Sequence, residues 1–199
     1  MTQAPVRLSF EEYLSLDVET IQGLMPEGRH EFIDGEFIQV APEAGRNARI
    51  ANRLFFYLIQ SGVPMDLISP GQCELQLPPL PSPKAPLNRY PDLVVVREEH
   101  IQQTEDRLTV YLDMEPPRIV VEVVSKGKRN RKRDYEDKLT QYALRGIPEY
   151  WIADPQTGYL YVLTLVEGEY KAQSFTGSDR IVSADLPGLK LTAQQVLRA

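Results

Sequence analysis

The sequence has few of the residues that build disulfide-rich or zinc-binding proteins. Cys73 is its only cysteine, so no internal disulfide can form, and this scarcity favours a reducing compartment. The two histidines, His30 and His100, belong to no Cys/His cluster, which argues against a zinc site. We therefore interpret both as surface or packing residues.

Long apolar runs are also missing. No segment approaches the roughly 20 apolar residues of a membrane-spanning helix, and the start, MTQAPVRLSFEEYL, lacks the charged-then-apolar pattern of a secretory signal. A chain of 199 residues with 42% hydrophobic content can bury a substantial core. We expect one globular domain over residues 1–199, cytoplasmic and without membrane association.

The charge is unevenly distributed. The net charge of -6 argues mildly against a polyanionic partner, yet residues 126–133, KGKRNRKR, hold six of the 22 basic side chains and no acid. Such a segment is typical of either a solvated helix start or a local phosphate contact. Its place at a predicted helix N-terminus favours phosphate, which would relieve the opposition between these cations and the helix dipole. The candidate phosphate contacts are Lys126, Lys128, Arg129, Arg131 and Arg133.

Two apolar, β-branched segments each contain one carboxylate. Residues 119–124 surround Glu122, and residues 89–96 contain Asp92. Both segments are typical of strands buried on both faces of a sheet. A buried carboxylate requires a cation, a metal or hydrogen bonds to offset its lost hydration. Two such strands side by side would make a site for a hard divalent cation, Mg²⁺ or Mn²⁺.

A helix with a lysine at the edge of its apolar face follows the basic segment. The apolar spacing predicts this helix over residues 132–145, with Lys138 able to stabilise charge on a phosphate. Two other interpretations stay open: a surface pair of Lys138 with Asp134, four residues earlier, and a buried Glu122–Lys138 ion pair without metal.

A β-hairpin is predicted over residues 31–40, because apolar alternation surrounds Asp34-Gly35. Glu31 lies on its first strand, where a lone acid more often faces solvent. The other expected elements are helices starting after Ser9 and over 46–60, 98–103 and 192–197, strands over 65–68, 73–77 and 149–154, a proline-rich loop over 78–86, an edge segment over 108–112 and a final hairpin of 159–166 with 170–175.

Several motifs in this order resemble one known family. They are Tyr90-Pro91-Asp92, then VEVVS at 121–125, then Asp134, Lys138 and Tyr142 followed by GIPEYW at 146–151. This pattern resembles the Uma-type restriction endonucleases of the PD-(D/E)XK phosphodiesterase superfamily. The segments FEEY at 10–13, EFIDGE at 31–36 and LPGL at 186–189 match further landmarks, so the resemblance covers nearly the whole chain.

The resemblance implies an α/β fold, a restriction-endonuclease-like mixed central sheet flanked by helices, with additional β-hairpins. It implies Asp92 and Glu122 as ligands of Mg²⁺ or Mn²⁺. The superfamily lysine stands two residues after the glutamate, where this chain has Val124, and the family pattern transfers that lysine's role to Lys138. By analogy with an early superfamily acid, Glu31 would be an auxiliary ligand or site acid.

The expected function is metal-dependent hydrolysis of nucleic-acid phosphodiester bonds, most simply of DNA, by a homodimer. One departure concerns Asn47, near which similar sequences often carry a histidine. The alternative is a catalytically silent nucleic-acid-binding or scaffold protein that retains the nuclease fold.

Overall fold

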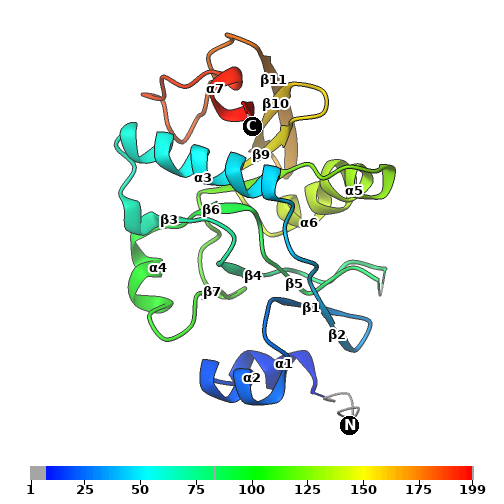
Figure 1. The fold of residues 1–199 in the computed structure, drawn as a ribbon. Helices are drawn as coiled ribbons and strands as arrows, with labels where there is room; N and C mark the ends of the chain where they lie inside the picture. The colour runs from blue at the N-terminus through cyan, green and yellow to red at the C-terminus, as the bar shows by residue number, and fades with distance from the viewer. Residues whose placement is uncertain (1–7, 83, 199) are drawn as a thin grey trace.

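The computed structural model describes residues 8–82 and 84–198 (Figure 1). Its helical elements are α1 Phe10–Ser15, α2 Val18–Leu24, α3 Gly45–Gln60, the 3-10 turn η1 Met65–Leu67, α4 Glu98–Gln103, α5 Lys128–Lys132, the π turn η2 Arg133–Asp137, α6 Lys138–Leu144 and α7 Ala193–Leu197. Its strands are β1 His30–Ile33, β2 Glu36–Gln39, β3 Ile68–Ser69, β4 Glu74–Gln76, β5 Asn88–Arg89, β6 Leu93–Val95, β7 Thr109–Val110, β8 Ile119–Val123, β9 Glu149–Asp154, β10 Tyr159–Val166 and β11 Glu169–Thr176.

A six-stranded mixed sheet forms the centre of the protein, in the order β11-β10-β9-β8-β6-β3. Strands β8 and β9 are parallel, and the other neighbours are antiparallel. Every residue of β8 and β9 is buried, which for β8 was predicted from the apolar, β-branched residues on both sides of Glu122. The fold class predicted from the sequence is confirmed.

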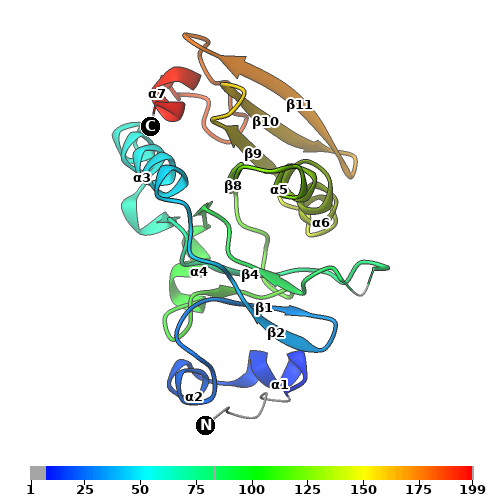
Figure 2. The ribbon, with the colours of Figure 1, turned by 45° about the vertical axis from the view of Figure 1, so that its right-hand side comes forward.

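Helices cover both faces of this sheet (Figure 2). Odd-numbered side chains of β8, such as Val121 and Val123, pack with α3 and α7 in one core cluster. Even-numbered side chains, such as Val120, pack with Tyr142 of α6 in a second cluster. Because strand side chains alternate between faces, Glu122 points to the same side as Val120, toward the α5–η2–α6 helix.

A second, smaller layer extends from the central sheet. It contains a three-stranded sheet, β5-β4-β7, and the β1–β2 hairpin, which packs on α1 and α2 at the opposite end of the protein from α7 (Figures 1 and 2). The hairpin turn is the predicted Asp34-Gly35 pair, with φ of 52° and 82°. Ser9 caps α1 through the predicted capping box.

Three sequence predictions of local structure need correction. Residues 89–96, predicted as one strand, are split between β5 and β6 in different sheets, because Pro91 lacks an N–H to continue the ladder. Residues 65–67 form the turn η1 and not a strand. The helix predicted over 132–145 begins at Lys128 and contains the π turn.

The other predicted elements occur close to their expected bounds, and α2 is an element that the sequence patterns did not predict. The described residues of the 78–86 loop form no helix or strand; Pro83 lies outside them. Within the described chain, no helix combines the length and the apolar character needed to cross a bilayer.

A buried carboxylate joins the elements of the smaller layer to one another. Glu74 on β4 is 3% exposed and accepts hydrogen bonds from four side chains. These donors are Tyr13, Asn88, Arg107 and Thr109. Asn88 also bonds to the backbone of β1 at His30 and Phe32. Glu74 therefore fixes the position of the hairpin strand that carries Glu31.

We expect Glu74→Ala to lower the free energy of unfolding by about 3–5 kcal/mol, because it leaves the Arg107 guanidinium buried without its counter-charge. Urea denaturation followed by circular dichroism measures this change. The matched control is Glu169→Ala, an exposed acid paired with Lys171, which should change stability by less than about 0.5 kcal/mol. Equal small effects of both substitutions would contradict this role of Glu74.

Candidate active site

Asp92 and Glu122 lie opposite each other on neighbouring strands. In the β6–β8 ladder Leu93 is paired with Val121, so the next position of the register places Asp92 across from Glu122. Directly opposed side chains share a face, with Cβ atoms about 4.5–5.5 Å apart. The two residues are 8% and 3% exposed, so both carboxyl groups are almost removed from water.

The α5–η2–α6 helix brings a lysine and a tyrosine to Glu122. The Lys138 Nζ atom lies 2.7 Å from Oε2 of Glu122 and 2.9 Å from Oδ1 of Asp134. The Tyr142 hydroxyl donates to Oε1 of Glu122 at 2.6 Å. Both alternative pairs considered for Lys138 from the sequence therefore occur together, and both are buried.

The π turn determines which side of the helix faces the sheet. Asp134, Lys138 and Tyr142 follow one another at intervals of four residues, which places them on one helical face. The wider turn at Arg133–Asp137 buries Asp134 completely, and the Tyr150 hydroxyl donates to its carbonyl oxygen at 2.8 Å. Isolated π turns within α-helices occur frequently at functional sites.

Asp92 and Glu122 have fewer hydrogen-bond donors than three other buried carboxylates of the chain. Glu74, Glu149 and Asp154 each accept from four donors. Within the described residues, Glu122 has one, the Tyr142 hydroxyl, beside its ion pair with Lys138, and Asp92 has one, the Val123 N–H at 2.6 Å. Glu74, Glu149 and Asp154 thus have the donors expected of structural carboxylates, whereas Asp92 and Glu122 retain acceptor capacity.

Negative charge accumulates around Asp92. Burial raises the pKa of Asp92 well above its ordinary value, and the charges of Glu122 and Glu43 raise it further, against the opposing effects of Lys138 and the Val123 N–H. Glu43, just before α3, was not singled out from the sequence. Within residues 8–82 and 84–198, no three Asp, Glu, His or Cys side chains form a metal-binding cluster, so any cation here would need water or substrate oxygens as well.

Glu31 lies at the rim of this arrangement. Its carboxylate is 3.6 Å from Nη1 of Arg89, whose Nε donates to Gln141 of α6. No hydrogen bond or ion pair in the described part of the chain joins Glu31 to Asp92 or Glu122. The structure therefore brings Asp92, Glu122 and Lys138 together, whereas Glu31 pairs with Arg89 and not with these three residues.

The basic segment divides into two groups. Three of its six cations have acidic partners: Arg131 with Asp154, Lys132 with Glu136 and Asp137, and Arg133 with Asp134. Lys126, Lys128 and Arg129 are exposed and form no ion pair with any described residue. The acidic partners therefore offset part of the unfavourable interaction between these cations and the helix dipole. Fewer cations of the segment are then available to bind phosphate.

Asn47 occupies the position near which similar sequences often carry a histidine. Its amide donates to the Val123 carbonyl at 3.0 Å and to the Ser125 hydroxyl at 2.8 Å, at the end of β8. Asn47 stands three residues before Ile50, on the apolar face of α3. A polar residue on an apolar helix face is the sequence signal that could have identified Asn47 as a buried hydrogen-bonding residue.

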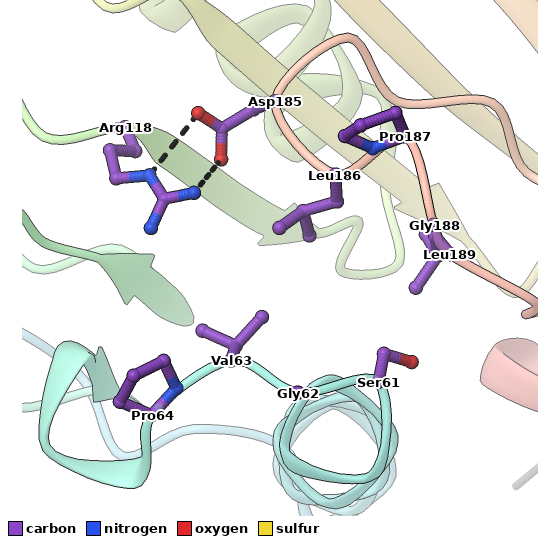
Figure 3. A pocket seen from close by; sticks show the side chains of 10 residues that line it. All are labelled: Ser61, Gly62, Val63, Pro64, Arg118, Asp185, Leu186, Pro187, Gly188 and Leu189. Carbon is purple, nitrogen blue, oxygen red and sulfur yellow. Dashed lines mark hydrogen bonds and ion pairs between the residues drawn. The ribbon is translucent and has the colours of Figure 1, made fainter.

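Two cavities adjoin different parts of the fold. One of about 220 Å³ lies at the C-terminal end of α3, where Arg118 and Asp185 form an ion pair across its wall (Figure 3). A larger one of about 710 Å³ reaches Pro42 and Tyr90, which closely precede Glu43 and Asp92 in the chain. None of Asp92, Glu122 and Lys138 lines the larger cavity, and the smaller one lies at the other end of α3 from Asn47.

We expect Asp92→Asn to stabilise the metal-free protein at neutral pH. A carboxyl group whose pKa is raised by folding makes the folded state less stable as pH rises from the group's ordinary pKa of 3.8. The gain in melting temperature from Asp92→Asn, measured in EDTA, should therefore be larger at about pH 8 than at about pH 5. Asp106→Asn, at an exposed acid, is the control. A gain that is absent or that shrinks with rising pH would contradict this electrostatic description.

Comparison with known proteins agrees with this architecture. A family model described as "Putative restriction endonuclease", Uma2, matches residues 10–194. The fold is similar to a crystal structure of a protein from Anabaena variabilis ATCC 29413, described as a putative nuclease belonging to DUF820, with a TM-score of 0.61, 16% identity and coverage of 96% of this chain and 97% of that one. No curated protein sequence matches. The family inferred from the sequence motifs is confirmed: the chain belongs to the Uma2 family.

Proposed function

We propose that this protein hydrolyses phosphodiester bonds of nucleic acid, with DNA as substrate and Mg²⁺ or Mn²⁺ as cofactor. The observation that carries the proposal is the pair of buried carboxylates, Asp92 and Glu122, opposite each other with few donors and a lysine in contact. Membership of the Uma2 family supports the same reaction class.

The residues present fit a hard divalent cation. Asp92 and Glu122 supply oxygen ligands, and one oxygen of Asp92 accepts no hydrogen bond from the described residues. The raised pKa of Asp92 reflects, after burial, repulsion from Glu122 and Glu43, which a divalent cation would remove. When bound, such a cation polarises a phosphoryl oxygen and lowers the pKa of a coordinated water.

The chain's own groups have distinct tasks in this proposal. Asp92 and Glu122 hold the cation, and the Tyr142 hydroxyl fixes the orientation of the Glu122 carboxylate. The Lys138 ammonium stabilises the negative charge that develops on the phosphate as the P–O bond breaks. Glu31 and Arg89 lie at the rim, where their charges act on substrate approach and not on the reacting atoms.

The substrate would approach from the exposed side of this site. Lys126, Lys128 and Arg129 follow β8 directly and would contact backbone phosphates, whereas Arg131 and Arg133 would first have to leave Asp154 and Asp134. Cutting both strands of a duplex requires two such sites, and we propose a homodimer for this reason.

One observation favours a second function. The closed Glu122–Lys138 pair satisfies the charges of both groups without metal, as expected of a silent protein that binds nucleic acid and retains the nuclease fold. The two functions differ in their response to Mn²⁺, because only the nuclease needs the cation at Glu122.

Cleavage of supercoiled plasmid with Mn²⁺ tests the proposed activity. We expect wild-type protein to nick or linearise the plasmid, and Glu122→Ala and Lys138→Ala each to lower the rate by at least about 100-fold, since each removes a group needed in the transition state. Lys171→Ala, at an exposed lysine paired with Glu169, is the matched control and should cut at the wild-type rate.

Cutting that persists unchanged in Glu122→Ala would place the activity elsewhere and reject this site. DNA binding without any cutting in Mn²⁺ would favour the silent protein.

DNA affinity should depend steeply on salt through the unpaired part of the basic segment. We expect Lys128→Ala or Arg129→Ala to reduce the slope of log affinity against log salt by roughly 0.9 for each phosphate that the variant no longer neutralises. Lys132→Ala is the control, because Lys132 is paired with Asp137 at 2.7 Å. Fluorescence anisotropy with a labelled duplex measures the slopes. The same slope in wild type and both test variants would remove this segment from the interface.

A further inference from the structure

Asp134 has an unusual environment for a buried acid. The residue is completely buried; its Oδ1 lies 2.9 Å from Lys138 Nζ in an ion pair and accepts a hydrogen bond from Arg133 Nε at 3.0 Å. Its Oδ2 is buried and has no hydrogen-bond donor among the described residues. A buried carboxylate oxygen without a donor is unfavourable, because folding removes its hydration and no hydrogen bond replaces it.

Among the described residues, one other buried carboxylate oxygen lacks a hydrogen-bond donor, and it has a cation beside it. Oδ2 of Asp185 also lacks a well-oriented hydrogen bond, but it lies 2.9 Å from Nη2 of Arg118 in an ion pair (Figure 3). The two ion pairs of Asp134, with Lys138 and Arg133, have their shortest distances to Oδ1 and not to Oδ2. This atom is therefore a vacant acceptor within a charged network, on the helical face that carries Lys138.

Lys138 is the donor best placed to use this acceptor. Its ammonium has three N–H groups, and the structure accounts for two of them, toward Glu122 and toward Oδ1 of Asp134. Asp134 itself is held in place, because the Tyr150 hydroxyl donates to its carbonyl oxygen and Arg133 to its carboxylate. A small shift of the flexible lysine side chain, away from Glu122, would bring it to the second oxygen.

A divalent cation on Glu122 would cause such a shift. It would compete with the ammonium for the same carboxylate and repel it as a like charge. The cationic groups nearby, Arg133 on the same helix and Arg89 on β5, offer Lys138 no alternative partner. Of the two acids paired with Lys138, Glu122 would face the cation, which leaves Asp134.

We propose that Asp134 is a positioning residue: it holds Lys138 at the site, through both carboxylate oxygens, when a divalent cation displaces the ammonium from Glu122. This inference rests on the proposed metal-dependent function. It adds that the Glu122–Lys138 pair is one of two arrangements of the same lysine and not a permanent closure of the site.

Mn²⁺ affinity measured by calorimetry on four proteins tests the inference. Without the Asp134 charge, Lys138 stays on Glu122, so Asp134→Asn should weaken Mn²⁺ binding by about tenfold or more. Lys138→Met removes the competing ammonium and should bind Mn²⁺ more tightly than wild type, a gain that damage to the fold would not produce. In the Lys138→Met background, Asp134→Asn should change the affinity by less than about threefold.

The outcomes separate this inference from the proposed function. If wild type binds Mn²⁺ and Asp134→Asn lowers the Mn²⁺ affinity equally in the wild-type and Lys138→Met backgrounds, the positioning role alone is overturned. The same conclusion follows if Asp134→Asn lowers the affinity in neither background. No Mn²⁺ binding by wild type overturns the proposed function and this inference together.

A second variant covers the case in which Asp134→Asn does not fold, as judged by circular dichroism. Asp134→Glu keeps the charge but moves the carboxylate by one methylene group, so kcat for plasmid cleavage should fall about tenfold with KM unchanged. An unchanged kcat would overturn the role of Asp134.

Discussion

The antiparallel pairing of β6 with β8 places two carboxylates side by side on a buried face of the central sheet. The register of this ladder, continued by one residue, places Asp92 opposite Glu122, and both carboxylates lose hydration that their few partners do not fully replace. The helix that packs on this face supplies Lys138 and Tyr142. The raised pKa of Asp92 is a direct consequence of this packing, because burial and the Glu122 charge both disfavour its ionised form.

The remaining architecture keeps this unfavourable arrangement in place. Glu74 and Glu149 are also buried, yet each accepts from four donors: Glu74 joins α1 to the three-stranded sheet, and Glu149 joins β9 to residues 183–185. The number of hydrogen-bond donors therefore distinguishes the acids that stabilise the fold from the acids that retain acceptor capacity for a ligand. Two adjacent buried carboxylates lower the stability of the fold, so the other buried polar groups must have their hydrogen-bond partners.

The sequence predicted the parts of the site that follow from strand and helix periodicity. Asp92, Glu122 and Lys138 were identified because each is a charged residue at an apolar position or at its edge, and the family motifs contain the same residues. The partners of Arg131 and Arg133 could not be predicted in full, since Asp154 lies on a strand 23 residues after Arg131 and the π turn reorients Asp134. Residues 89–96 were wrongly predicted as one strand, because their apolar content does not reveal that the strand ends at Pro91.

The central claim is that Asp92 and Glu122 together bind a divalent cation. A crystal of the protein soaked in Mn²⁺, with data collected at the manganese absorption edge, tests it most directly. The account predicts an anomalous peak between the two carboxylates, with Lys138 moved away from Glu122. A fully soaked crystal with no peak there and the Glu122–Lys138 pair intact would contradict it.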